Sequence, residues 1–337
     1  MQHVSNLTDK KLLIFGGAGS LGQALVSFYR QYISDIVVVS RDEAKHWELK
    51  NKFPPLNSRK KISTIICDVR DPRRVSQVIR QENPTYVIIA QALKQVDTCE
   101  NQPSESIDTN VIGVRNVLDA IEENSIRPDN KITRVCFVST DKACNPINVY
   151  GMCKSISEKL VIATAAKSSV AYMVTRYGNV ISSRGSIVPL FLKQAKEAEA
   201  FTITDPNMTR FMMLLEESVK LIDMALAYGT SGSMWVPKLD SFKVEDLATY
   251  FSKKFNKPTK IIGIRPGEKI HEIMMNELED IKKEDYGFAY CIRESWSRQK
   301  ASGPFKDYSS KDVVISYEEL SRRLDQFLEK ETYDRKI

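Results

Sequence analysis

The 337 residues include 49 Lys and Arg against 43 Asp and Glu, which gives a net charge of +6 in a chain of which 27% is charged. So small a surplus does not favour nucleic acid as a partner. A hydrophobic share of 42% is ordinary for a globular protein and excludes disordered and fibrous chains.

The first residues, MQHVSNLTDKK, lack the apolar core of a signal peptide. No later stretch approaches the ~20 apolar residues that a membrane helix needs. We therefore expect a soluble, cytoplasmic protein with no membrane partner. The six cysteines are scattered, without a Cys-x-x-Cys pair or a histidine at ligand spacing, so we expect neither disulfides nor a metal site.

Short apolar runs alternate with amphipathic stretches of helical periodicity from Lys11 to about Tyr177. The runs are KLLIF, IVVVS, ISTIIC, YVIIA, RVCFVS and AYMVTRY. Buried parallel strands joined by helices produce this rhythm, so the sequence predicts an α/β fold with a doubly wound parallel sheet. After Tyr177 the rhythm is irregular, which indicates a smaller, mixed C-terminal lobe for the substrate.

The predicted division of the chain follows from this change of rhythm. Residues 1–178 should form the sheet domain, to which residues 229–258 return. Residues 179–228 and 259–337 should form the smaller lobe. The polar residues 294–312 should be a long loop before a last helix from Tyr317 to about Lys330.

Gly16, Gly19 and Gly22 follow the first apolar run and open a helix in the order Gly-x-x-Gly-x-x-Gly. A glycine turn at this place lets backbone N–H groups approach a pyrophosphate, whose charge the helix N-terminus favours. The alternative is a tight turn that serves packing alone. The position between strand and helix favours a dinucleotide site, in which Ser20 and Leu21 belong to the same turn.

The second apolar run ends at Ser40 and Arg41, near the place of an acidic residue in folds that prefer NAD. A hydroxyl and a guanidinium suit a phosphate, so the sequence favours NADP. Alternatively, Arg41 is a solvated surface residue and Asp42 binds the ribose. After the third run, Asp68 is expected to accept a hydrogen bond from the adenine amino group, and Val69 to pack on the ring.

Tyr150 and Lys154 stand one helical turn apart, so the phenol and the ammonium share one face of the helix. A nearby lysine charge lowers the pKa of a tyrosine, and the phenolate can then remove a hydroxyl proton as hydride leaves the adjoining carbon. Any helix can carry this pair by chance. Here it follows the fifth run and Ser139 and Thr140, whose hydroxyls can fix a substrate oxygen.

With these motifs the chain resembles the extended short-chain dehydrogenases/reductases. The stretch STDKACNPINVYGMCK, from Ser139 to Lys154, is similar to the UDP-N-acetylglucosamine 4,6-dehydratases, and the resemblance covers nearly the whole chain. It is closest to the short, soluble members that invert carbon 5. The chain departs from the family where Ile89–Ala92 replaces His-Ala-Ala-Ala, beside the nicotinamide ribose, and where Phe15 replaces Thr.

The resemblance implies an internal redox cycle with NADP. Tyr150, helped by Lys154 and Thr140, would take the 4-hydroxyl proton while hydride passes from carbon 4 to the cofactor. Lys142 would remove the carbon 5 proton and Asp141 would protonate the departing 6-hydroxyl, after which hydride returns to carbon 6. Such a lysine must be neutral, which requires burial or a nearby cation such as Lys154. Without the resemblance, Asp141 and Lys142 would be a surface ion pair.

The resemblance implies that the sheet domain, residues 1–178 with 229–258, is an NADP-binding Rossmann domain. It implies that the smaller lobe, residues 179–228 and 259–337, binds the nucleotide sugar. It also assigns residues to the two ligands. The expected cofactor contacts are Gly16, Gly19, Ser20, Leu21, Gly22, Ser40, Arg41, Asp68, Val69, Ala90, Ala92, Tyr150, Lys154 and Val180. The expected contacts of the UDP-sugar are Lys94, Asn179, Gly185, Ser186, Val188, Arg210, Arg265 and Glu268. Alternatively, Arg265 and Glu268 form a salt bridge at a Pro-Gly turn, and Arg210 caps the turn at Asp205.

The sequence therefore predicts a UDP-N-acetylglucosamine 4,6-dehydratase for the biosynthesis of a deoxyamino sugar of a surface glycan or glycoprotein. One alternative is another nucleotide-sugar enzyme, such as a UDP-hexose 4-epimerase, a UDP-glucose 4,6-dehydratase or a reductase. An epimerase has no use for Asp141 and Lys142 as an elimination pair. A catalytically idle NADP-binding protein is a further alternative. The family forms dimers through helices that flank the sheet, so residues 105–123 and 149–168 are the expected contacts of a homo-oligomer.

Overall fold

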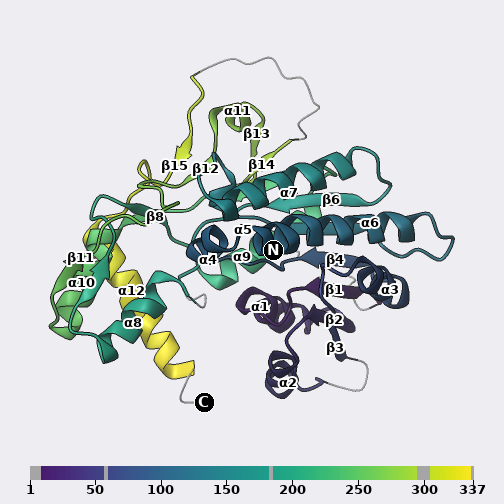
Figure 1. The fold of residues 1–337 in the computed structure, drawn as a ribbon, viewed down its shortest axis with the longest axis horizontal. Coiled ribbons are helices and arrows are strands. Elements are labelled where there is room, and N and C mark those ends of the chain that lie inside the picture. The colour runs from purple at the N-terminus through teal and green to yellow at the C-terminus, as the bar shows by residue number, and fades with distance from the viewer. Residues whose placement is uncertain (1–8, 57–59, 182–184, 294–303, 335–337) are drawn as a thin grey trace.

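The computed structural model describes residues 9–56, 60–181, 185–293 and 304–334. A nine-stranded sheet runs through the centre of this described part (Figure 1). Its strands are β1 (Lys11–Phe15), β2 (Asp35–Ser40), β3 (Lys61–Ile66), β4 (Tyr86–Ile89), β5 (Arg134–Val138), β6 (Ala171–Thr175), β9 (Met234–Pro237), β13 (Lys283–Asp285) and β14 (Ala289–Ile292). The order is β13-β14-β9-β6-β5-β4-β1-β2-β3, and the strands from β9 to β3 are parallel.

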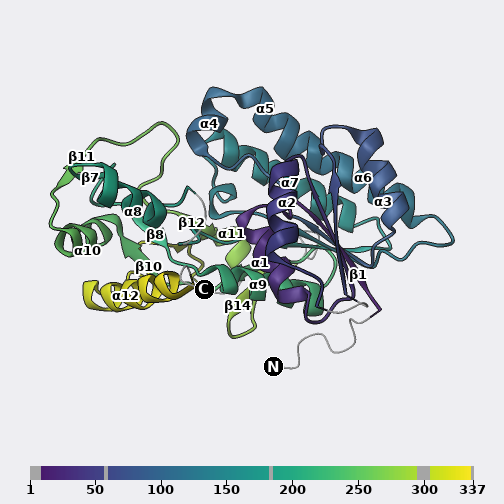
Figure 2. The same ribbon diagram turned by 90° about the horizontal axis from the view of Figure 1, so that it is seen from below.

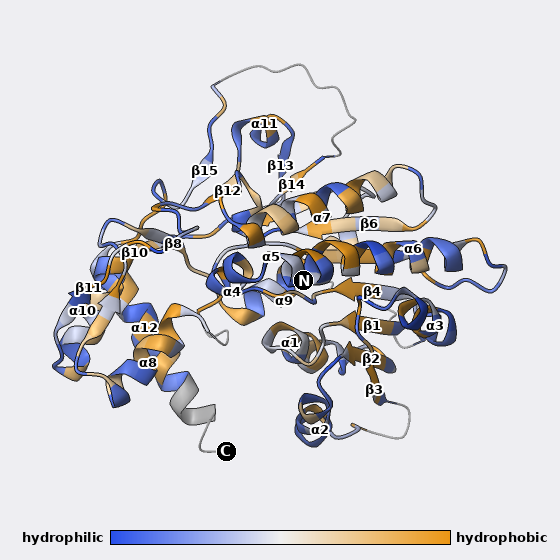
Figure 3. Cartoon of the chain, viewed as in Figure 1, coloured by the Kyte–Doolittle hydropathy of each residue, from blue (hydrophilic) through white to orange (hydrophobic). Residues whose placement is uncertain are grey.

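The central strands are continuously apolar because both faces of the sheet are covered. Leu12, Leu13, Val37 and Val38 are fully buried, and Leu13 pairs in register with Val37 and Val87. Figure 3 shows these strands as hydrophobic between helices that are polar in part. Burial on both faces explains why the runs do not alternate. The doubly wound α/β fold predicted from the sequence is confirmed.

Helices cover the two faces of the sheet. They are α1 (Ser20–Tyr29), α2 (Glu43–Lys52), α3 (Pro72–Glu82), α4 (Val96–Asn101), α5 (Pro103–Ile107), α6 (Gly113–Ser125), α7 (Val149–Ala165) and α9 (Leu215–Tyr228), with a π-helical turn at Asp108–Ile112. The helices α3, α6 and α7 pack side by side on one face, and α1 packs with α9 on the other (Figure 2). The hydroxyl of Tyr29 in α1 donates a 3.0 Å hydrogen bond to Asp223 in α9.

A second lobe has a core of its own. It contains α8 (Ile187–Glu197), α10 (Val244–Phe255) and α12 (Tyr317–Asp334), with the strand pairs β7 (Phe201–Ile203) and β11 (Thr259–Ile261), and β8 (Thr209–Phe211) and β10 (Ser241–Lys243). Phe191, Phe201 and Phe251 are fully buried at its centre and pack ring against ring. Figure 2 shows this lobe beside the sheet domain.

Three segments lie differently from the division that the sequence suggests. Within residues 229–258, β9 joins the sheet, but α10 packs in the second lobe because Leu247 and Phe251 belong to that core. The helix α9, expected in the lobe, covers the sheet through Leu221 and Ile222. The strands β13 and β14 extend the sheet from the C-terminal part of the chain.

Two expectations concern the C-terminal part. The predicted loop falls partly on residues 294–303, outside the described residues, and its remainder contains β15 (Tyr308–Ser309), which pairs with β12 (Ile273–Met275). The short helix α11 (Glu277–Asp280) follows β12. The last helix begins at Tyr317, as predicted, and runs past Lys330 to Asp334. Among the described helices, none combines the length and apolar character that crossing a bilayer would require.

Candidate active site

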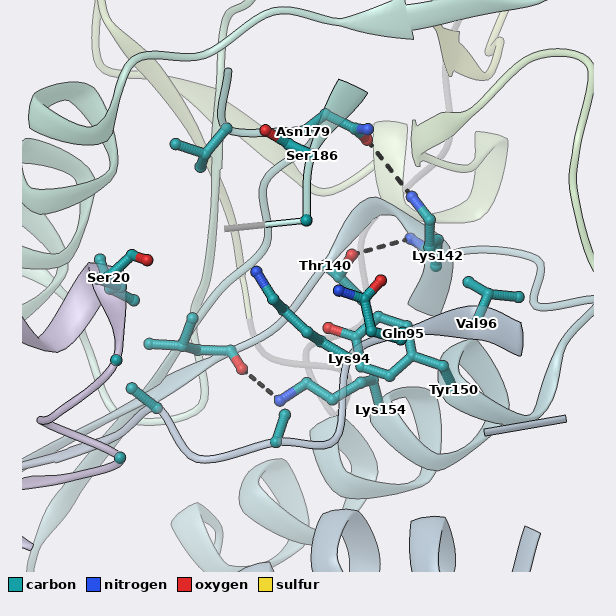
Figure 4. A pocket seen from close by; sticks show the side chains of 18 of the residues that line it. Ser20, Lys94, Gln95, Val96, Thr140, Lys142, Tyr150, Lys154, Asn179 and Ser186 are labelled. Carbon is teal, nitrogen blue, oxygen red and sulfur yellow. Dashed lines mark hydrogen bonds between the residues drawn. The ribbon is translucent and has the colours of Figure 1, made fainter. Parts of the chain in front are cut away.

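A cavity of about 920 Å³ lies between the carboxyl ends of the parallel strands and the second lobe. This is the edge where doubly wound folds bind their ligands. Its volume is at the upper end of the range for ligand pockets. The strand ends, the helix α7 and the loops that enter the second lobe all contribute to its lining (Figure 4).

The glycine turn after β1 forms one end of the cavity. Gly16 has φ +79°, and a Cβ atom added there would lie 2.6 Å from the backbone nitrogen of Gln91. Only glycine allows the turn to come this close to the loop after β4, and α1 begins directly behind it at Ser20. The side-chain nitrogen and oxygen of Gln91 are buried without hydrogen-bond partners among the described residues. The turn and Gln91 therefore form a cradle with unused polar atoms, which suits a dinucleotide.

The loop after β4 is held by a buried asparagine. Asn110, in the π-helical turn, accepts a 2.9 Å hydrogen bond from the backbone N–H of Leu93 and donates one of 2.9 Å to the Leu93 carbonyl. Both backbone groups of one residue are thus fixed. Lys94, the next residue, lines the cavity (Figure 4).

Two cations line the cavity at the end of β2. Arg41 has a side chain that is 47% exposed and lies 3.6 Å from Asp68. Lys45, which the sequence analysis missed, pairs with Asp42 at 2.5 Å and also lines the cavity. Asp42 caps α2 by accepting a 3.1 Å hydrogen bond from the Lys45 backbone. Ser40 Oγ lies 2.7 Å from His46 Nε2.

Asp68 is the one expected cofactor contact that does not line the cavity. Arg70 donates hydrogen bonds to both oxygens of its carboxylate: Nε donates to Oδ1 at 3.1 Å and to Oδ2 at 2.9 Å, and Nη2 donates to Oδ2 at 2.6 Å. Arg70 also reaches Glu105 at 2.8 Å. The carboxylate is therefore occupied by arginine rather than directed at an adenine, while Val69 does line the cavity.

The turn after β5 and the start of α7 carry the reactive groups. Asn148 caps α7 by accepting a 2.7 Å hydrogen bond from Gly151. The hydroxyl of Thr140 accepts from the Lys142 backbone at 3.4 Å and donates to Asp141 at 2.9 Å. Figure 4 shows Thr140, Lys142 and Tyr150 around one part of the cavity.

Lys154 is buried below the cavity. Its Nζ donates a 2.5 Å hydrogen bond to the Val138 carbonyl and lies 4.0 Å from the centre of the Phe137 ring. Burial lowers the pKa of Lys154 to about 7. This amine therefore loses its charge near neutral pH, unlike an ordinary lysine.

Tyr150 faces a different cation from the one that its spacing suggests. Burial raises the pKa of its phenol to about 12, and the charge of Lys142 is the largest opposing effect. A hydrogen bond with Thr140 also lowers this pKa. The sequence analysis assigned the charge effect to Lys154, whose ammonium is instead directed at Val138.

Lys142 lies between two buried carboxylates. Its Nζ is 3.2 Å from Asp141 Oδ1 and 3.1 Å from Glu272 Oε1, and it donates a 3.4 Å hydrogen bond to Asn179. Burial lowers the pKa of Lys142, but the two carboxylates outweigh burial and raise the pKa above its ordinary value. This corrects the expected neutral lysine, because the nearest charges are anions rather than Lys154.

Asp141 shows the opposite behaviour. Burial raises the pKa of its carboxyl group, which Lys142 opposes and Glu272 reinforces. Asp141 is fully buried, so the pair is not the surface ion pair that composition alone suggests. The site thus combines the Tyr150 phenol, in the first turn of α7, with the Asp141 carboxyl group and the Lys142 amine, in the turn after β5. These three groups are suited to stepwise proton transfer.

A family described as polysaccharide biosynthesis protein matches residues 12–294. The chain belongs to this family. Proteins named UDP-glucose 4-epimerase from Rickettsia bellii and Rickettsia akari are 41% and 40% identical over 294 residues, which are 84% of this chain and 83% of theirs.

Solved structures show the same fold as this chain. Pen from Bacillus thuringiensis is 30% identical with a TM-score of 0.87, over 96% of this chain and 100% of its own. DesIV, a dTDP-glucose 4,6-dehydratase from Streptomyces venezuelae with NAD and TYD bound, is 18% identical with a TM-score of 0.66, over 77% and 86% of the two chains. The fold is that of nucleotide-sugar epimerases and dehydratases.

In this family member, the expected sugar-nucleotide contacts gather at the lobe side of the cavity, with one exception. The lining includes Lys94, Asn179, Gly185, Ser186, Arg210, Arg265 and Glu268. Val188 instead packs in the core of the second lobe. Glu268 accepts a 3.0 Å hydrogen bond from the Arg265 backbone, which leaves the Arg265 guanidinium out of that contact.

Arg210 does not cap the turn at Asp205. Its Nη1 donates hydrogen bonds to the carbonyls of Thr209 and Ile270, at 2.8 and 3.1 Å. The Asp205 carboxylate accepts from the Asn207 backbone at 2.7 Å. Arg210 is buried at the cavity wall, so its charge acts on the site rather than on the surface.

Proposed function

We propose that this chain is a UDP-N-acetylglucosamine 4,6-dehydratase that inverts carbon 5 through an internal cycle of bound NADP. The observation that carries the proposal is the contact beside Tyr150 between the fully buried Asp141 and Lys142, whose side chain is 19% exposed. Burying a carboxyl group and an ammonium costs several kcal/mol per ion. Elimination of water would give both groups a role, because Lys142 would remove a proton and Asp141 would deliver one to the leaving hydroxyl.

A 4-epimerase is the second candidate, because the curated relatives from Rickettsia carry that name. Epimerisation requires oxidation and reduction at carbon 4, for which Tyr150, Thr140 and Lys154 suffice. It leaves Asp141 and Lys142 without a function. Their burial at the cavity therefore favours elimination of water.

The residues divide the work by their positions. Tyr150 takes the 4-hydroxyl proton, and Thr140 orients the phenol. The dinucleotide that the Gly16 turn would hold would supply the hydride chemistry at carbons 4 and 6. The ketone at carbon 4 acidifies the carbon 5 proton, which Lys142 removes, while Asp141 protonates the departing 6-hydroxyl. The product is a UDP-2-acetamido-2,6-dideoxy-hexos-4-ulose, a precursor of a deoxyamino sugar.

The cavity supports the proposed cofactor and substrate. The Gly16 turn and Gln91 would cradle the dinucleotide, and Arg41 and Lys45 would bind a 2′-phosphate, which favours NADP. The structure of DesIV was solved with NAD, so the choice between the two is a matter for titration. Arg210 and Arg265 would face the UDP pyrophosphate.

The test is to incubate the protein with UDP-N-acetylglucosamine and to determine the mass of the product. We expect a UDP-sugar lighter by one water. A product of unchanged mass with the 4-epimer spectrum would identify an epimerase and overturn the proposal. UDP-glucose in a parallel reaction shows whether the N-acetyl form is preferred.

We also propose a homodimer through the face of α7, at the helices expected from the sequence. Met152 and Ile156, one turn apart in α7, are 46% and 51% exposed. Exposed apolar side chains grouped in this way are typical of subunit contacts. Met152→Asp combined with Ile156→Asp should yield a monomer in light scattering, and a wild-type monomer would contradict the proposal.

A further inference from the structure

Glu272 is a buried carboxylate that the proposed chemistry has not yet used. It precedes β12, and its backbone is held by Ser310, with a 2.9 Å hydrogen bond in each direction. The side chain is 2% exposed and reaches Lys142 at 3.1 Å through Oε1. Its Oε2 is buried without a hydrogen-bond partner among the described residues.

The geometry places two carboxylates on one ammonium. Asp141 contacts Lys142 from the other side at 3.2 Å, and its Oδ2 is also buried without a partner in the described part of the chain. Two neighbouring carboxylates with one counter-charge do not both ionise readily, so one tends to keep a proton. The two orphaned oxygens are places where such a proton can reside.

The other charges near Glu272 decide which carboxylate stays ionised. Arg210 and Lys269 both favour the charged form of Glu272 and, together with Lys142, lower its pKa against the effect of burial. Lys269 itself donates a 2.7 Å hydrogen bond to the Cys144 carbonyl. His271, which directly precedes Glu272, instead lies with its Nδ1 2.9 Å from Thr209 Oγ1. Positive charge therefore gathers on the Glu272 side, and the proton belongs on Asp141.

We propose that Glu272 is the positioning residue of the elimination step, which keeps Asp141 protonated and accepts a proton from Lys142 so that Lys142 can act as a base. This inference rests on the proposed function and deepens it. It gives Lys142 a proton acceptor 3.1 Å away. The resting pair favours the charged lysine and the carboxylate, because the pKa of Lys142 is raised and that of Glu272 is lowered, so this transfer is an uphill step of turnover.

The protons balance over the cycle. The reactive form is the one in which Tyr150 has lost its phenolic proton to solvent, which the charge of Lys142 favours against the effect of burial on the pKa of Tyr150. In this form Asp141 is protonated, Lys142 is charged and Glu272 is a carboxylate. Tyr150 takes the 4-hydroxyl proton, and Lys142 passes one proton to Glu272. Lys142 then breaks the carbon 5–hydrogen bond, and the bond from carbon 6 to oxygen breaks as Asp141 donates its proton and water leaves.

The second half restores the site. The hydride of carbon 4 would reach carbon 6 through bound NADP, and one proton of the site goes to carbon 5. Glu272 and Tyr150 each hold one proton at this point. One of these protons goes to carbon 5 and the other returns to Asp141, so that Glu272 and Tyr150 are again ionised and Asp141 is again protonated. Thr140, hydrogen-bonded to Asp141 at 2.9 Å, lies on the path from Tyr150.

The experiment compares Glu272→Gln and Glu272→Asp with the wild type in single turnovers with UDP-N-acetylglucosamine. Reduced-nicotinamide absorbance reports oxidation at carbon 4, and product mass reports water loss. We expect Glu272→Gln to oxidise carbon 4 at the wild-type rate but to lose water about 10²–10⁴-fold more slowly. The alkaline limb of its rate profile should move to lower pH, because Asp141 loses the neighbouring charge that holds its proton.

Glu272→Asp keeps the charge and should restore the alkaline limb. Glu279→Gln is the matched control, since it removes a buried ion pair with Arg176, 2.7 Å long, outside the cavity lining. It should lower Tm without moving the pH profile. If the wild type makes only an epimer, the proposed function fails. If the wild type dehydrates and Glu272→Gln keeps its rate and profile, or slows oxidation and water loss equally, the inference alone is overturned.

Discussion

The α-carbon of Gly151 faces the carbonyl oxygen of Lys142 so closely that an added Cβ atom would lie 2.2 Å from it. This contact joins the helix that carries Tyr150 to the turn that carries Lys142. Because the turn is backbone, it cannot yield as a flexible side chain does. The absence of a side chain at residue 151 therefore allows the close approach of the Tyr150 helix to the Lys142 turn.

Gly151→Ala should push the turn away from α7. We expect unfolding in urea to show a loss of about 1–3 kcal/mol, as for overpacking in a core, together with a lower kcat. Ser155→Ala, in the same helix, is the matched control and should change neither. A Gly151→Ala variant with wild-type stability and kcat would mean that the helix and the turn adjust freely.

Lys142→Ala should separate oxidation from elimination. Loss of the Lys142 charge should raise the pKa of Tyr150 further, so nicotinamide reduction should slow but persist. Water loss should fall much more, by ~10²–10⁴, because the base is absent. In heavy water, the wild-type product should carry deuterium at carbon 5, and the hydrogen at carbon 6 should come from carbon 4. Tyr150→Phe is the control that should block both steps. Undiminished dehydration by Lys142→Ala would remove this lysine from the mechanism.

Arg41→Asp should reverse the preference for the cofactor. A charge-assisted hydrogen bond contributes about 1.5–3 kcal/mol, so NADP should lose roughly tenfold or more in affinity. The new carboxylate should accept from the ribose hydroxyls of NAD. Calorimetric titration with both dinucleotides measures this, with Lys45→Ala as a comparison for the second cation. Tighter binding of NAD by the wild type would show that the end of β2 does not select a phosphate.

Lys154→Met should stabilise the fold in a pH-dependent way. The folded protein holds the Lys154 proton only up to about pH 7, whereas an unfolded lysine keeps it to about pH 10.4. The unfolded state thus binds more protons between these values, so the destabilisation is complete below about pH 7 and fades as pH rises. The gain in Tm should be large near pH 6 and small near pH 10. An equal gain at both values would point to packing instead.

The sequence predicts the sheet and the local motifs because their signals lie within single elements. KLLIF followed by glycines, and Tyr150 followed by Lys154, need only neighbouring residues. The roles of Asp68 and Val188 depend on what packs beside them, namely Arg70 and the second core. Spacing along the chain does not contain that information.

Glu272 shows the same limit at the candidate site. It meets Lys142 only after β12 is brought beside the turn by its pairing with β15. Its segment, GIRPGEKIHE, carries the family resemblance without pointing to this glutamate. The charge state of Lys142 could not be deduced because it depends on this distant partner. The one signal in the sequence is that an acidic residue, Glu272, stands directly before the apolar strand β12.

The two hydrophobic cores of the described residues share no side chain: one lies around the sheet and the other around Phe191, Phe201 and Phe251. Substitutions that reshape the second core can therefore leave the strand ends that hold the redox machinery undisturbed. Under the proposed function, sugar preference can change through the second lobe while the hydride and proton chemistry at the strand ends stays the same. We therefore expect that a chimera with α8, α10 and α12 of a relative would accept a different sugar and keep the positions of the groups at the strand ends and in α7.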